Sequence, residues 1–161
     1  MKSYTSFLDT PIGLLEIKAT DAGILSVNFS EDARQNASGE NSLSIRAKIA
    51  LEAYFSGTGK IFDLPLIFTG TDFQQRVWSQ LLAIPYGTTI SYLELAKKLG
   101  DPKCIRAAAA ANGKNPFAIM VPCHRVVGSN NDLVGYAGGL WRKRWLLEHE
   151  NKTANGLQLL F

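Results

Sequence analysis

The stretch "SYLELAKKLGDPKCIRAAAAANG", residues 91–113, contains two helix-forming segments joined by a short turn. Ser91 and Glu94 have the spacing of a capping box, which favours a helix start at this point, and Gly100 is a typical helix stop. The turn "DPK" is followed by "CIRAAAAANG", which predicts a second helix that ends at Gly113. Two short helices joined by a tight turn are typical of a DNA-binding helix-turn-helix, although any αα-hairpin has the same pattern.

The predicted second helix carries a run of five alanines, Ala107 to Ala111. Alanine is the best helix former, and this alone can explain the run. The alternative is a helix face without bulk that lies close against another surface, such as the minor groove of DNA, which is only about 6 Å wide. Arg106 is the one long charged side chain at the start of the run. It could enter the base stack where a nucleotide has left it.

The residues before this stretch divide into two parts of different character. "GLLEIKAT" (13–20) and "GILSVNF" (23–29) have strand-like patterning on either side of the turn signal "DAG". "SLSIRAKIALEAYFSG" (42–57) predicts a helix that stops at Gly57. Its apolar residues at helical spacing are Leu43, Ile45, Ile49 and Ala53. We therefore expect an α/β domain over residues 1–70, with a small antiparallel sheet and one helix.

From residue 71 onward the pattern is mainly helical. "TDFQQRVWSQLLAIPYG" (71–87) begins with a Thr or Asp cap, and Pro85 and Gly87 end it. The helix-turn-helix segment follows directly. We therefore expect a second, mainly α domain over residues 71–161.

Composition and charge narrow the classes of function. A hydrophobic fraction of 46% with 19% charged residues is ordinary for a packed globular protein. No apolar run approaches membrane-spanning length and the N-terminus lacks the core of a signal peptide, which predicts a cytosolic protein. Residues 97–144 hold nine Lys and Arg against two Asp. This excess predicts a polyanionic partner, unless it is only a solvated basic face.

The cysteines and histidines do not form a metal-binding pattern. Cys104, Cys123, His124 and His149 include no CxxC or HExxH spacing, so we expect no metal and two free thiols. There is also no Gly-rich phosphate loop or dinucleotide fingerprint, so we expect no nucleotide cofactor.

The segment "IMVPCHRVVG", residues 119–128, places a cysteine beside a histidine. One interpretation is an apolar strand over 119–121 that ends at Pro122 and carries a buried packing cysteine. The other makes Cys123 a thiolate nucleophile, with His124 and Arg125 supplying a positive field that lowers its pKa. These residues alone leave both open.

Over residues 73–150 the chain resembles the methylated-DNA–protein-cysteine methyltransferases, which repair O6-alkylguanine irreversibly. The matching segments are "FQQRVW" (73–78), "IPYGTTISYLELA" (84–96), "RAAAAANGKNPFAIMVPCHRVVG" (106–128), "GYAGGL" (135–140) and "KRWLLEHE" (143–150). The "PCHRV" motif is highly specific when it occurs together with these other segments. The resemblance implies a ribonuclease-H-like α/β N-terminal domain and a C-terminal domain with a winged helix-turn-helix.

The resemblance also implies roles for individual residues. Cys123 would accept the alkyl group, and His124 would act on its thiol through a bound water as the base, oriented by Glu150. Tyr92 would help to rotate the nucleotide out of the duplex and protonate the leaving guanine. Asn115 would join the recognition helix to the cysteine segment as a hinge.

The implied partner is double-stranded DNA with O6-alkylguanine, bound through the minor groove by a monomer without cofactor or membrane attachment. O4-methylthymine as a substrate is left open. The implied DNA-binding residues are Lys103, Arg106, Ala107, Ala108, Ala111 and Arg125. The residues implied for the pocket of the flipped base are Tyr92, Val126, Tyr136, Ala137 and Gly138.

Two other functions remain as alternatives. A damage-binding module that marks lesions without transfer would lack the cysteine, so the Cys123, His124 and Glu150 set argues against it. A cysteine hydrolase would need turnover and an oxyanion hole, which no feature of the sequence requires.

The chain departs from the family pattern at two positions. At Cys104 we interpret the side chain as a packing residue. At Asn131, where glycine is common in the family, a left-handed turn is still feasible.

Overall fold

The structure is a computed structural model that describes residues 2–31 and 36–156. The chain forms two compact units. One comprises the residues up to Phe68 together with Pro116–Met120, and the other comprises Thr69–Asn115 and the residues from Val121 onward. Among the described residues, no helix is both long and apolar enough to cross a membrane.

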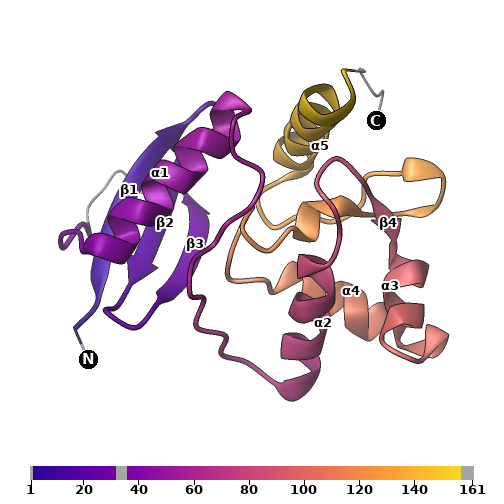
Figure 1. Cartoon of the computed structure of the whole chain (residues 1–161). Helices are drawn as coiled ribbons and strands as arrows, with labels where there is room; N and C mark the ends of the chain where they lie inside the picture. Colours follow the sequence, from indigo (N-terminus) through magenta and orange to yellow (C-terminus); the bar gives the residue numbers. More distant parts are fainter. Residues whose placement is uncertain (1, 32–35, 157–161) are drawn as a thin grey trace. The chain divides into compact units, whose positions relative to one another are not determined.

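The first unit is an antiparallel sheet with one helix, as predicted (Figure 1). Strands β1 (Tyr4–Thr10), β2 (Gly13–Ala19) and β3 (Ile24–Ser30) pair in that order. Helix α1 (Ser42–Ser56) packs against them and ends at Gly57, whose φ of 86° is the left-handed conformation that glycine adopts without strain.

The buried face of α1 includes only part of the apolar residues that the sequence places at helical spacing. Leu43, Ala47, Leu51 and Tyr54 are buried, whereas Ile45 and Ile49 are 45% and 62% exposed. Spacings of three and four residues place the buried set on one stripe toward the sheet. The apolar residues at helical spacing thus fall on two stripes, and Ile45 and Ile49 belong to the one that does not meet the sheet.

The edge of this sheet is extended by residues from much later in the chain. Val27 N donates to Pro116 O (2.9 Å) and Ala118 N donates to Val27 O (2.8 Å). The ring of Phe117 packs edge-on against Phe68, with centroids 5.5 Å apart. Residues 116–120 thus belong to the first unit. The predicted division into residues 1–70 and 71–161 does not include this crossing of the chain between the units.

The second unit is built on helices, which have the predicted order. They are α2 (Asp72–Leu82), α3 (Tyr92–Lys98), the 3₁₀ turn η1 (Pro102–Cys104), α4 (Ile105–Gly113) and α5 (Leu140–Asn155). The capping box predicted at Ser91 and Glu94 is present, and Thr71 with Gln74 forms a second one. Helices α3 and α4 pack on each other and on α2, which confirms the helix-turn-helix arrangement.

Residues 119–121 do not form the predicted strand. Ile119 has a φ of 71°, which no extended strand allows and which strains a β-branched residue. The backbone instead forms tight turns, in which Met120 N donates to Ala118 O and Cys123 N donates to Val121 O, both over 2.8 Å. The chain then enters a single 3₁₀ turn, η2 (Cys123–Arg125).

A short parallel ladder follows η2. Strand β4 (Ile90–Ser91) pairs with β5 (Val126–Val127) immediately after the site segment. The turn η3 (Ser129–Asn131) comes next, with Asn130 and Asn131 at φ values of 58° and 61°. Asn131 therefore adopts the left-handed backbone that the sequence allowed for it.

Candidate active site and DNA interface

Cys123 lies in the interior of the second unit. It opens the turn η2, and only 8% of its surface is exposed. Burial raises the pKa of the Cys123 thiol, and the Asn115 amide and the Lys143 charge offset this only in part. The expectation of a pKa lowered by His124 and Arg125 was therefore wrong for the resting protein, and the thiol needs a base before it can react.

His124 and Glu150 form a buried pair. His124 Nε2 lies 2.6 Å from Glu150 Oε2, and the two side chains are 0% and 1% exposed. Burial lowers the pKa of His124 more than the carboxylate raises it, so the imidazole is neutral at pH 7. Because an ionised carboxylate can only accept, Nε2 carries the proton and Nδ1 is the basic nitrogen. Nδ1 is buried and has no hydrogen-bond partner among the described residues.

Arg125 is part of this pair and does not lie on the surface. Its Nε donates to Glu150 Oε1 (2.8 Å), its Nη2 to Glu150 Oε2 (3.1 Å) and its Nη1 to the carbonyl of Ile84 (2.7 Å). The side chain is 6% exposed. The prediction that Arg125 contacts DNA was therefore wrong: its guanidinium is used to hold Glu150.

Glu150 is ionised despite its burial. Burial alone would raise the pKa of its carboxyl, but the hydrogen bonds from His124 and Arg125 and the charge of Arg125 outweigh that effect and hold the pKa well below its usual range. The carboxylate thus orients the His124 ring and keeps its Nδ1 available.

Asn115 connects the end of α4 to the segment that carries Cys123. Its Nδ2 donates to the carbonyl of Val121 (2.7 Å), and its amide is the group that most favours the thiolate of Cys123. The hinge role of Asn115 remains a prediction.

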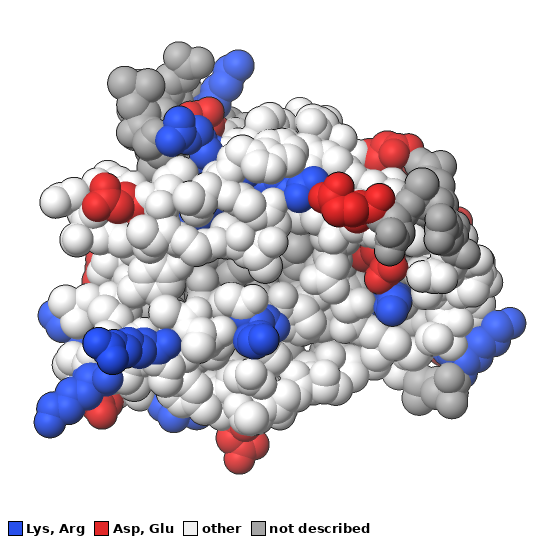
Figure 2. Space-filling model, turned by 180° about the vertical axis from the view of Figure 1, so that it is seen from behind, with Lys and Arg blue, Asp and Glu red and all other residues white. Residues whose placement is uncertain are grey.

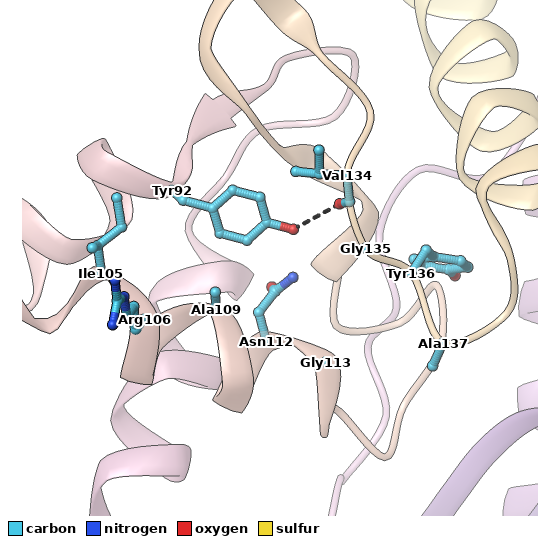
Figure 3. Close-up of a pocket in the computed structure, with 10 residues that line it drawn as sticks. All are labelled: Tyr92, Ile105, Arg106, Ala109, Asn112, Gly113, Val134, Gly135, Tyr136 and Ala137. Atoms are coloured by element: carbon cyan, nitrogen blue, oxygen red, sulfur yellow. Dashed lines mark hydrogen bonds between the residues drawn. The ribbon is translucent and has the colours of Figure 1, made fainter.

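A pocket of about 590 Å³ opens between α3, α4 and the loop before α5 (Figure 3). Its lining is mainly apolar and includes three residues predicted for the flipped base, Tyr92, Tyr136 and Ala137. The other two do not line it: Val126 is fully buried in β5, and the carbonyl of Gly138 accepts from Arg142 Nη1 (2.9 Å). A concave apolar pocket with few polar groups suits a planar ligand such as a base.

Two tyrosines supply hydroxyl groups at this pocket. Tyr92 donates from its hydroxyl to the carbonyl of Val134 (3.1 Å). Burial raises the pKa of Tyr92 and raises that of Tyr136 further, and a charge on Cys123 raises both, so both phenols stay protonated at pH 7. The hydroxyl oxygen of Tyr136 is buried without a partner in the described structure. The Tyr92 hydroxyl can therefore donate a proton or a hydrogen bond to a bound base.

Lys143 is a site residue that the sequence reasoning missed. It is fully buried, and its Nζ donates to the carbonyls of Val134 (2.9 Å) and Gly135 (3.2 Å) and lies 3.5 Å from the Tyr92 hydroxyl. Burial lowers the pKa of Lys143 to about 8. The signal was its spacing from Leu146, Leu147 and Glu150, which places it on the buried stripe of α5.

The predicted recognition helix α4 presents only part of its alanine run to solvent. Arg106, Ala107 and Ala110 are exposed, whereas Ala108 and Ala111 are 0% and 3% exposed. Trp78 Nε1 donates to the carbonyl of Ala111 (2.9 Å), on the inner face of the helix. The prediction that Ala108 and Ala111 contact DNA was therefore wrong, because a period of 3.6 residues turns them toward α2 and α3.

Exposed basic side chains gather around this helix. Lys and Arg project at the lower left of Figure 2, over the end of the unit that holds α3 and α4. The exposed basic residues of these helices and of the turn between them are Lys97, Lys98, Lys103 and Arg106. The described residues contain no group of three or more His, Cys, Asp or Glu side chains that could hold a metal ion.

Two family models together span nearly the whole chain. The model for the "6-O-methylguanine DNA methyltransferase, DNA binding domain" matches residues 72–152, and the model for its "ribonuclease-like domain" matches residues 3–68. The chain belongs to the 6-O-methylguanine DNA methyltransferase family. This confirms the resemblance and the two-part fold read from the sequence.

The chain is similar to members of this family over nearly their whole length. The chain is 44% identical to a methylated-DNA–protein-cysteine methyltransferase of Methanosarcina acetivorans over 91% of this chain and 97% of that protein. A crystal structure of the Mycobacterium tuberculosis O6-methylguanine methyltransferase has a TM-score of 0.85 and 43% identity, with 95% of each chain covered. A structure of the M. tuberculosis protein in complex with DNA has a TM-score of 0.84 and 45% identity, with 92% of each chain covered.

Proposed function

We propose that this protein repairs alkylated DNA by direct reversal, as a methylated-DNA–protein-cysteine methyltransferase that transfers the alkyl group of O6-alkylguanine to its own Cys123. The observation that carries the proposal is that His124 Nδ1 has no hydrogen-bond partner within the described part of the chain. His124 directly follows Cys123, whose buried thiol needs a base. The adjoining pocket has room for a base that has left the duplex.

The steps of the transfer follow from these groups. His124 Nδ1 takes the Cys123 proton through a water, and the thiolate attacks the alkyl carbon of the lesion. The bond from that carbon to O6 breaks, and its electron pair stays on the guanine. Tyr92, a protonated phenol, gives the guanine ring a proton and regains one from solvent, to which His124 releases its own. The alkyl group remains on Cys123 as a thioether, so each molecule acts once.

The partner is double-stranded DNA, which exposed basic residues on α3, η1 and α4 would bind through its phosphates. Arg106 would fill the space left by the flipped base, and the small exposed side chains Ala107 and Ala110 would let α4 approach the minor groove closely. We expect the protein to act as a monomer in the cytosol.

The test is mass spectrometry after incubation with a duplex that contains O6-methylguanine. We expect one added methyl per molecule, located on Cys123 by peptide mapping, with none on Cys104, the other free thiol. Cys123→Ser should bind the duplex and gain no mass. Wild-type protein that binds the lesion without gaining a methyl would instead be a damage-binding module, and repeated turnover would indicate a hydrolase.

A further inference from the structure

Asn112 is a buried polar residue at the pocket that takes no part in the transfer steps. It lies on α4, is 4% exposed, and its side chain points toward the hydroxyl end of Tyr92 (Figure 3). Its Nδ2 donates to the carbonyl oxygen of Cys123 over 3.3 Å. The amide therefore connects the predicted recognition helix directly to the residue that carries the nucleophile.

The same amide faces Tyr92, because the Asn112 side chain points toward the phenol across the pocket (Figure 3). This polar group opposes the rise in the pKa of Tyr92 that burial causes. Tyr92 is the proton donor of the transfer, so its hydroxyl must be free to leave the carbonyl of Val134 when a base enters. A fixed donor nearby can stabilise the oxygen after it gives up its proton.

The other end of the Asn112 amide carries a cost for the folded state. Its Oδ1 is buried and has no hydrogen-bond partner among the described residues. An unpaired buried carbonyl destabilises the folded state, and a leucine of similar shape would remove this penalty. Residues that reduce stability without an evident structural return are concentrated at functional sites.

We propose that Asn112 is a positioning residue, whose carboxamide holds the Cys123 carbonyl in place and presents a polar group to the Tyr92 hydroxyl at the pocket. The effect on repair rests on the alkyl-transfer function proposed above. Asn112 acts through these two residues: Cys123, which carries the sulfur, and Tyr92, which gives the guanine ring its proton.

The experiment compares Asn112→Leu with Asn112→Gln, which keeps a donor, and with Asn155→Leu, the same change at an exposed position of α5. The first measurement is the single-turnover rate of methyl transfer from an O6-methylguanine duplex across pH. The second is the pH dependence of Cys123 alkylation by iodoacetamide without DNA, followed by peptide mass spectrometry with Cys104 as the internal reference. The third is the melting temperature of each variant.

We expect Asn112→Leu to transfer methyl about tenfold more slowly, a loss consistent with one hydrogen bond, and to have a displaced pH profile in both reactions. Its melting temperature should equal or exceed that of the wild type, Asn112→Gln should recover part of the rate, and Asn155→Leu should behave as wild type. Unchanged profiles, or a loss of rate that only follows a loss of stability, would overturn the proposal. If the wild type gains no methyl, the alkyl-transfer function fails, and the iodoacetamide profiles alone decide whether Asn112 controls Cys123.

Discussion

Glu150 Oε2 lies 2.6 Å from His124 Nε2, although the two residues are 26 positions apart and both are buried. The same carboxylate accepts two hydrogen bonds from Arg125. One negative charge therefore compensates a buried guanidinium and fixes the tautomer of a neutral imidazole. Stability and chemistry thus depend on the same side chain. Variants of Glu150 should change both properties, whereas variants of the DNA-binding surface should change DNA binding alone.

Replacement of Glu150 by glutamine should damage both properties. The Arg125 guanidinium would remain buried without a counter-charge, so the free energy of unfolding should fall by about 3–5 kcal/mol. The carboxamide can offer His124 either an acceptor or a donor, so the tautomer would no longer be fixed, and transfer should slow by about tenfold or more. Urea denaturation and single-turnover kinetics at 10 °C would measure the two effects, and an unchanged unfolding free energy would contradict the buried ion pair.

The buried pair should also make the protein sensitive to acid. The pKa of Glu150 is lower in the folded protein than in the unfolded chain, so its contribution to stability is complete above the unfolded value of about 4.5 and is lost as the pH falls further. His124, whose folded pKa is also lowered, takes up a proton on unfolding below about pH 6.5, which acts in the same direction. Denaturation at pH 7, 5 and 4 should show falling stability. Glu150→Gln should show a shallower decline below pH 5, and equal slopes would exclude Glu150 as the cause.

Local patterns in the sequence were sufficient for most of the helix-turn-helix. The capping box at Ser91, which starts α3, depends on hydrogen bonds and backbone angles within a few residues, so the local sequence predicts it well. The same is true of the stop at Gly57 in the first unit, which ends α1. The face of α1 was not predictable in this way, because Ile45 and Ile49 form as regular a stripe as the one that meets the sheet.

The parts of the site that the sequence misplaced depend on distant partners. In the sequence, nothing distinguishes Arg125 from a surface cation. Its partner, Glu150, comes 25 residues later and is identified only by the structure. Lys143 is linked to the pocket only through the carbonyls of Val134 and Gly135, two lining residues that accept from its Nζ. The backbone of Ile119 has a positive φ, which is incompatible with a strand, and nothing in the apolar run 119–121 predicts this angle.

Lys143 should make stability rise with pH in the alkaline range. Its pKa is about 8 when folded and 10.5 as the ordinary value, so the unfolded chain binds more protons between these two limits. The free energy of unfolding of wild type relative to Lys143→Met should therefore increase from pH 7.5 to 9.5, by an amount on the order of 1 kcal/mol. Lys143→Met should also slow transfer, because two carbonyls beside the pocket lose their donor. A difference independent of pH would show that Lys143 stays charged throughout.

Arg106 should affect binding without affecting stability, since it is exposed at the start of α4. Arg106→Ala should weaken binding of an O6-methylguanine duplex, and one lost phosphate contact would reduce the slope of log K against log salt by about 1. If Arg106 enters the base stack instead, affinity for the lesion should fall with little change in that slope. Fluorescence anisotropy between 50 and 200 mM salt separates the two, as the salt range is wide enough to define a slope. Full affinity in the variant would exclude either role.

The alanines of α4 provide a matched pair on two faces of one helix. Ala110 is exposed and Ala108 is fully buried, so the same change to leucine should have opposite consequences. Ala110→Leu adds bulk to the face proposed to enter the minor groove, and it should weaken DNA binding while the melting temperature stays unchanged. Ala108→Leu forces a larger side chain into a packed interface, and it should destabilise the protein by about 1–3 kcal/mol. Equal DNA affinity for Ala110→Leu and wild type would mean that α4 does not lie in the groove, and DNA would then have to bind another face of the unit.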